Sequence, residues 1–177
     1  MIDKLHIGAG KNYLPDWINL DIFSDNKVDL YSSAMTIPYP RASFRLIYAS
    51  HVLEHFNRNM TYAVLTHWRD LLIHNGILRL AVPDFKAICR YYQSTGELEQ
   101  VLGLMYGGQK IQIDTHHIIF DREYLIKCLK VVGFQTIREW DWRKTEHSKY
   151  DDYSQAYLPH MDKDEGILMS LNIEAVK

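Results

Sequence analysis

Residues 4–22, KLHIGAGKNYLPDWINLDI, decide the fold. This segment places a short apolar run, Lys4 to Ile7, before the turn Gly8-Ala9-Gly10, and a second apolar run, Trp17 to Ile22, after it. Short apolar runs separated by a glycine turn are typical of buried strands. In an open α/β sheet, a turn that follows the first strand lies at the carboxyl edge, where ligands bind and where glycine lets the backbone come close to them.

The rest of the chain alternates between strand and helix patterns. Further strands are expected at Val28 to Tyr31, Arg45 to Ala49, Ile77 to Val82, Phe134 to Trp142 and Ile167 to Val176. Helices are expected from Met60 to Asn75-Gly76, in two stretches between Asp84 and Tyr106, and from Asp121 to Gly133. This order predicts an α/β fold with a doubly wound, mostly parallel sheet and an antiparallel C-terminal strand. The stretch between Gly10 and Trp17 is too short for a full first helix, so we expect that helix to be truncated.

Composition indicates an ordinary globular protein. The chain has 177 residues, of which 47% are hydrophobic, so one domain spanning residues 1–177 is expected. A formal net charge of −2 argues against nucleic acid as a partner. The sequence contains no secretory signal and no run of eighteen apolar residues, which predicts a cytoplasmic protein without a membrane span. Cys89 and Cys128 are isolated, as expected of reduced thiols that pack inside a cytosolic protein.

The glycine turn differs from the phosphate-binding fingerprint of dinucleotide-binding proteins. That fingerprint requires a third glycine where this chain has Tyr13, and an acidic residue about 20 positions further on. Here Asp21 follows Gly10 after only eleven positions. The pattern therefore favours a loop that approaches a ligand closely, followed by a carboxylate that binds ribose.

Four segments together resemble one enzyme family. They are KLHIGAGKNYLPDWINLDI (4–22), SFRLIYASHVLEHF (43–56), GILRLAVPDF (76–85) and SLNIEAVK (170–177). These segments are similar to class I S-adenosylmethionine (SAM)-dependent methyltransferases, in particular the small type often encoded among bacterial surface-glycan biosynthesis genes. The resemblance covers nearly the whole chain. It implies a Rossmann-like methyltransferase fold and SAM as the cofactor.

The resemblance also implies where the cofactor is bound. Gly8 and Gly10 approach its methionine and ribose parts, and Asp21 binds the ribose hydroxyls. Asp29-Leu30 lies beside the adenine, and the segment ending at His51 closes the pocket near the sulfonium. These roles suit the chemistry, because a carboxylate accepts two vicinal hydroxyls and an apolar wall suits a purine. The complete set of expected cofactor contacts is Gly8, Ala9, Gly10, Asp21, Ile22, Asp29, Leu30, Ala49, Ser50 and His51.

The histidines suggest two kinds of chemistry. His51-Val52-Leu53-Glu54-His55 matches HxxEH, the zinc signature of inverted zincin proteases. The sequence offers no further ligand in support of that pattern, so we expect no metal. Methyl transfer to a hydroxyl needs a base near neutral pH, and His116, which matches the family's histidine, or His51 is the candidate.

The segment Asp84 to His117 follows the last parallel strand and is expected to form a cap on the acceptor side. Asp84 itself is interpreted as a helix cap. The leading hypothesis is methyl transfer to a small hydroxyl- or amine-bearing acceptor, with a surface-polysaccharide sugar suggested by the resemblance alone. One alternative is a degenerate cofactor-binding module that assembles with a partner, in which a second copy of the chain in a homodimer would complete the wall that the truncated first helix leaves open. The other alternative is a zinc hydrolase.

Overall fold

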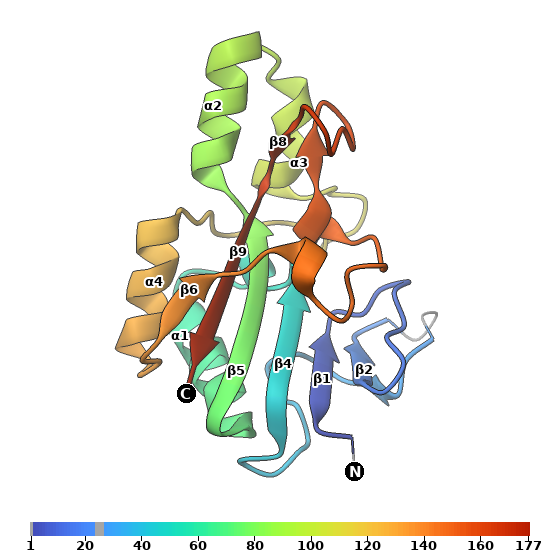
Figure 1. Ribbon diagram of the computed structural model, residues 1–177, viewed down its shortest axis with the longest axis vertical. Coiled ribbons are helices and arrows are strands. Elements are labelled where there is room, and N and C mark those ends of the chain that lie inside the picture. The colour runs from blue at the N-terminus through green and yellow to red at the C-terminus, as the bar shows by residue number, and fades with distance from the viewer. Residues whose placement is uncertain (1, 24–26) are drawn as a thin grey trace.

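Among the residues that the structure describes, seven strands form one sheet in the order β3-β2-β1-β4-β5-β9-β6 (Figure 1). The computed structural model describes residues 2–23 and 27–177. The strands are β1 (Lys4–Ile7), β2 (Ile18–Asp21), β3 (Leu30–Tyr31), β4 (Phe44–Ser50), β5 (Leu72–Pro83), β6 (Ile137–Glu139) and β9 (Ser170–Val176). Strands β1 to β5 run parallel to one another, whereas β9 is antiparallel to both β5 and β6. The predicted mostly parallel sheet with an antiparallel C-terminal strand is confirmed.

Within the described part of the chain, four α-helices connect and flank these strands. They are α1 (Thr61–Leu71), α2 (Phe85–Thr95), α3 (Glu99–Tyr106) and α4 (Arg122–Val131), and three 3-10 turns are η1 (Leu53–His55), η2 (Trp142–Lys144) and η3 (Tyr153–Gln155). A small hairpin pairs β7 (Tyr157–Leu158) with β8 (Ile167–Leu168). The predicted ends of α4 are confirmed, because the Asp121 carboxylate accepts a hydrogen bond from the Tyr124 N–H at 2.8 Å and Gly133 follows the helix with a φ of 95°.

The first helix of the fold is missing, as expected: the described residues between β1 and β2 contain no helix. Neighbouring residues of β4 face opposite sides of the sheet. Ile47 packs in the large core that includes side chains of α1 and α4, whereas Tyr48 packs on the other side with Trp17 and Trp140. Residues 140–156, drawn in orange in Figure 1, therefore cover the sheet face that lacks its helix.

Several boundaries differ from the sequence prediction. The expected helix to Asn75-Gly76 ends at Leu71, and β5 begins at Leu72 instead of Ile77. The reason lies in tertiary packing, since Leu72 is fully buried and pairs with Phe44 of β4. The remaining differences are shorter strands: β3 covers only Leu30–Tyr31, β6 covers only Ile137–Glu139, and the expected strand Ile167 to Val176 is divided between β8 and β9.

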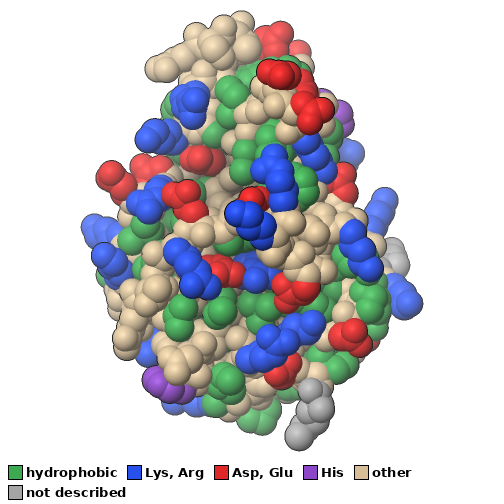
Figure 2. Space-filling model, viewed as in Figure 1, with side chains coloured by type: hydrophobic (Ala, Val, Ile, Leu, Met, Phe, Trp, Pro, Cys, Tyr) green, Lys and Arg blue, Asp and Glu red, His purple; other side chains and the backbone are tan. Residues whose placement is uncertain are grey.

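Charged side chains of both signs are mixed on the surface. Figure 2 shows Lys and Arg interspersed with Asp and Glu over one face, in agreement with the net charge of −2. None of the helices within residues 2–23 and 27–177 combines the length and hydropathy that a membrane span needs.

Candidate functional site

A cavity of about 810 Å³ lies at the carboxyl edge of β1 and β4. Its size falls in the range of small-molecule and cofactor sites, which is roughly 300–1,000 Å³. Four parts of the chain form its walls: the turn after β1, the end of β4, α3 with the segment after it, and residues 151–161. The lining residues that carry the argument below are Gly8, Ala9, Gly10, Ser50, His51, His55, His116 and Asp152.

The glycine turn is held against β2 by its own backbone. The N–H groups of Gly8 and Ala9 both donate to the Leu20 carbonyl, at 2.9 and 3.0 Å. Gly8 has a φ of 71° and Gly10 a φ of 54°, the left-handed region that favours glycine. A Cβ added to Gly8 would also lie 2.4 Å from the Val52 side chain, whereas Gly10 has open space around it. Backbone strain disfavours other residues at both positions, and a clash adds to it at Gly8 alone.

This difference predicts unequal stability losses for two matched variants. Gly10→Ala is expected to lower the free energy of unfolding by about 1 to 2 kcal/mol, the penalty of the left-handed conformation for alanine. Gly8→Ala is expected to lower it by a further 1 to 3 kcal/mol or so, because the new methyl group overpacks against Val52. Urea unfolding of the two variants measures the difference, and equal losses would contradict the close packing of this turn.

Asp21 lies beside the turn, at the end of β2. Its carboxylate accepts hydrogen bonds from the Gly10 N–H at 2.7 Å and from the Phe23 N–H at 2.9 Å. Asp21 is 5% exposed and does not line the cavity. Each carboxylate oxygen still has acceptor capacity beyond its one backbone donor. In the structure, Asp21 therefore fixes the position of Gly10.

The expected cofactor contacts divide into two groups. Gly8, Ala9, Gly10, Ser50 and His51 line the cavity, while Asp21, Ile22, Asp29, Leu30 and Ala49 lie outside its lining. Asp29 accepts hydrogen bonds from the Asn19 N–H at 2.8 Å and from the Tyr13 hydroxyl at 2.7 Å, so it connects β2 to the turn region. Ala49 is buried in the core, and Ile22 is exposed.

His51 begins the loop after β4 with a φ of 51°. Its Nε2 lies 3.3 Å from the Ser170 hydroxyl, and its ring lies 5.1 Å from the ring of Tyr153. Burial, together with the neighbouring histidines His116 and His55, lowers the pKa of His51 to about 3. The imidazole is therefore neutral at physiological pH and is a weak base.

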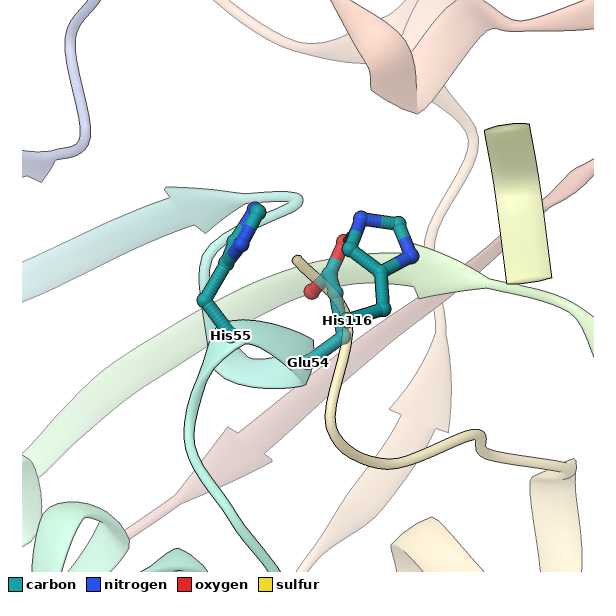
Figure 3. Close-up of side chains that lie close together, drawn as sticks. All are labelled: Glu54, His55 and His116. Atoms are coloured by element: carbon teal, nitrogen blue, oxygen red, sulfur yellow. Dashed lines mark ion pairs between the residues drawn. The ribbon is translucent and has the colours of Figure 1, made fainter. Parts of the chain in front are cut away.

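The structure brings Glu54, His55 and His116 together (Figure 3). Glu54 and His55 belong to η1, and His116 arrives from the segment after α3. The His117 N–H donates to the Glu54 carbonyl at 2.8 Å, which joins the two segments. His116 Nε2 lies 3.9 Å from Glu54 Oε1. The imidazole rings of His55 and His116 pack edge to face with their centroids 4.8 Å apart. Sequence reasoning singled out all three residues without predicting this contact, because Glu54 and His116 are 116 − 54 = 62 positions apart.

Burial dominates the electrostatics of this group. It raises the pKa of the Glu54 carboxyl to about 8. It also lowers the pKa values of His55 and His116, against smaller opposing effects from hydrogen bonds to backbone carbonyls. In the absence of any ligand, the three groups are therefore mainly uncharged at neutral pH.

In the segment 84–117, which is expected to form a cap on the acceptor side, one residue caps a helix and one part lines the cavity. Asp84 caps α2, as interpreted from the sequence, since its carboxylate accepts from the Lys86 N–H at 2.9 Å. From the segment 84–117, α3 and the residues after it reach the cavity, whereas α2 does not line it.

Residues 151–161 form a wall of the cavity that sequence reasoning missed. Asp152 is held there by the Tyr48 hydroxyl, which donates to its Oδ2 at 2.6 Å, and by the Ser50 hydroxyl at 3.3 Å from Oδ1. The stretch reads as a polar connection between two strands, and no local pattern marks it as part of a site. Only the return of the chain over β4 places it there.

Comparison with protein-family models and with curated proteins gave no match. Solved structures do match over almost the whole chain. A SAM-dependent methyltransferase from Archaeoglobus fulgidus is 15% identical with a TM-score of 0.60, and the match covers 98% of this chain and 85% of that one. A SAM-dependent methyltransferase from Thermotoga maritima is 14% identical with a TM-score of 0.62, covering 98% and 81%.

A third match has a ligand bound. The 1,6-didemethyltoxoflavin-N1-methyltransferase of Burkholderia thailandensis was solved with S-adenosylhomocysteine and is 14% identical, with a TM-score of 0.59 and coverage of 98% and 70%. At these identities the likeness establishes the fold. The chain has the α/β Rossmann-like fold of SAM-dependent methyltransferases, which confirms the expected fold class.

Proposed function

We propose that the protein is a cytoplasmic, single-domain SAM-dependent methyltransferase acting on a small hydroxyl- or amine-bearing acceptor. One observation carries this proposal: the cavity of about 810 Å³ lies at the carboxyl ends of β1 and β4 and has the glycine turn on one wall and His51, His55 and His116 on another. The fold and the sequence resemblance support the same cofactor. Among acceptors, the resemblance favours a sugar of a surface polysaccharide.

The cofactor is proposed to lie along the glycine turn. Gly8, Ala9 and Gly10 offer backbone without side chains larger than a methyl group, so a ligand can approach the chain closely. Asp21 is proposed to bind the ribose hydroxyls with the acceptor capacity that its two backbone donors leave free. Asp29-Leu30 is proposed to lie beside the adenine, while Ala49 supports the loop of Ser50 and His51 from behind.

The acceptor is proposed to enter from the side of α3 and His116. With SAM bound, the acceptor oxygen or nitrogen would form a bond to the methyl carbon as the bond from that carbon to sulfur breaks, with S-adenosylhomocysteine as the leaving group. The acceptor proton would pass to a base. His116 is better suited than His51 to take this proton, since a pKa of about 3 makes His51 a weak base.

Replacing Asp21 tests the ribose contact. Asp21→Ala is expected to weaken the binding of S-adenosylhomocysteine by about 1 to 3 kcal/mol, the usual effect of losing a charged hydrogen-bond partner. Asp21→Asn is the matched control, because its side-chain oxygen can still accept from the Gly10 N–H and preserve the turn. Calorimetry measures the affinities. Unchanged affinity in both variants would remove Asp21 from the site.

Methyl transfer itself is tested with labelled cofactor. The purified protein is incubated with SAM carrying an isotopically labelled methyl group and with a panel of sugars, nucleotide-linked sugars and small amines. Label is expected in a hydroxyl- or amine-bearing product, with one S-adenosylhomocysteine formed per methyl group. No labelled product with any member of this panel, from protein that binds SAM, would contradict the proposed acceptor class.

A further inference from the structure

We propose that Glu54, His55 and His116 bind one divalent transition-metal ion in the wall of the cavity. Zn²⁺ is the ion used below for bond lengths and for the binding test. One ligand atom from each residue lies within 4.8 Å of the others. Two imidazoles and a carboxylate are a donor set that zinc and neighbouring divalent metals accept in open, three-residue sites. This inference goes beyond the proposed methyltransferase function, which does not require a metal.

The first support is the isolation of the Glu54 carboxyl group. Its side chain is fully buried, and neither oxygen has a hydrogen-bond partner among the described residues. His51 Nδ1 approaches Oε1 to 3.3 Å, but the contact lacks hydrogen-bond geometry. A buried polar group without a partner destabilises a protein by about 1 to 3 kcal/mol, so such groups usually have a specific reason. A cation between the three side chains supplies the missing partner.

The second support is the orientation of the two imidazoles. His55 Nδ1 lies 3.2 Å from the Thr115 carbonyl, and His116 Nδ1 lies 3.0 Å from the Leu104 carbonyl. A carbonyl oxygen only accepts hydrogen bonds, so each Nδ1 carries the proton and each Nε2 keeps its lone pair. Histidine ligands of metals typically show this arrangement, in which the second ring nitrogen donates to a carbonyl or carboxylate.

The distances require only a modest closure. Two ligands at the tetrahedral angle on zinc are about 3.4 Å apart, given zinc–ligand bonds of about 2.0 to 2.2 Å. His116 Nε2 and Glu54 Oε1 are 3.9 Å apart. In the view of Figure 3 the Glu54 carboxylate is drawn between the rings of His55 and His116. The ligand atoms lie within 4.8 Å of one another, so the widest pair would have to close by at most about 1.4 Å to reach the zinc spacing.

The position gives the metal access to ligands. His55 and His116 line the cavity, whereas Glu54 is fully buried and does not line it. An ion held by all three residues would therefore lie at the wall of the cavity. A metal with an open position lowers the pKa of a bound hydroxyl or water. An ion held here would occupy the Nε2 lone pair of His116, so the base role proposed for His116 applies to the metal-free protein.

The structure supplies the ligand whose absence from the HxxEH pattern led the sequence analysis to expect no metal. The sequence around HxxEH offers no further ligand, whereas the structure places His116 beside Glu54 and His55. The resulting set differs from the zincin pattern, because His51 turns its Nε2 toward Ser170 and is replaced by His116. The cluster therefore predicts metal binding without predicting hydrolysis.

The test is zinc binding to the cofactor-free protein. After dialysis against a chelator and then against metal-free buffer, the protein is titrated with Zn²⁺ by calorimetry and with Co²⁺ by visible absorption. We expect one metal ion per chain. Glu54→Gln and His116→Asn should each weaken Zn²⁺ binding by at least the roughly 10- to 100-fold that loss of an outer hydrogen-bond partner causes.

Two exposed histidines serve as matched controls. His117 is adjacent to His116. His74 lies near the first residue of β5, at the end of the strand away from the cavity. Neither histidine belongs to the cluster. His117→Asn and His74→Asn should bind Zn²⁺ like the unchanged protein. If Glu54→Gln does not fold by circular dichroism, His55→Asn takes its place.

Three results would overturn the proposal: no zinc binding by the unchanged protein, full affinity in the folded cluster variants, or equal loss in the two controls. The measurement uses no SAM. Failure of the metal site is therefore distinguishable from failure of the proposed function, which is judged by cofactor binding to the metal-free protein.

Discussion

Replacing His116 by asparagine is expected to lower the turnover number of the proposed methyl transfer by roughly 10²- to 10⁴-fold, the range typical of losing a general base. The affinity for SAM should stay unchanged, because His116 lies on the wall formed by the segment after α3 and not on the glycine turn. Asparagine can still donate from its amide to the Leu104 carbonyl, which His116 Nδ1 reaches at 3.0 Å, so the loop should remain in place.

The control for this variant is His117→Asn, the neighbouring exposed histidine. Single-turnover kinetics and calorimetry separate the chemical step from cofactor binding. If turnover, cofactor affinity and thermal stability all fall together in His116→Asn, the residue only orders the loop. A loss of turnover that chelator reproduces in the unchanged protein would assign His116 to the metal site rather than to proton transfer.

The second large effect concerns Tyr48, which joins the sheet to residues 140–156. Tyr48 is fully buried, its ring stacks on His6 and packs at a tilt against His147, and its hydroxyl donates to Asp152. Tyr48→Ala is expected to lower the free energy of unfolding by about 3 to 5 kcal/mol, as for other large aromatic side chains in cores. Since whole domains are stable by only about 5 to 15 kcal/mol, this variant should be close to unfolding.

A conservative variant separates packing from hydrogen bonding at this position. Tyr48→Phe keeps the ring and removes the hydroxyl, so the loss should be only about 1 to 3 kcal/mol, from the Asp152 carboxylate that remains without its donor. Urea unfolding measures both variants. A Tyr48→Ala protein as stable as Tyr48→Phe would show that residues 140–156 do not take the place of the missing helix.

Local sequence signals predicted the parts of the fold that depend on local contacts. The turn Gly8-Ala9-Gly10 between two apolar runs corresponds to β1, the glycine turn and β2. Asp121 and Gly133 marked both ends of α4 because a helix cap depends on residues only a few positions away. The same is true of Asp84 at the start of α2.

Features that depend on distant contacts were missed. Leu72 continues the apolar spacing of the predicted helix, yet it begins β5 because it pairs with Phe44 of the neighbouring strand β4. Tyr48 and Asp152 are 104 residues apart, so nothing in the sequence around Asp152 identifies it as part of the cavity wall. The contact between Glu54 and His116 is of the same kind.

Calorimetric titration of the metal-free protein with SAM and with S-adenosylhomocysteine tests the central claim most directly. The account predicts that both ligands bind to one site per chain, and that Asp21→Ala weakens the binding of each. Adenosine alone should bind more weakly, because it lacks the methionine part that the glycine turn is proposed to contact. No detectable heat with either ligand at millimolar concentration, from protein that is folded by circular dichroism, would contradict the account.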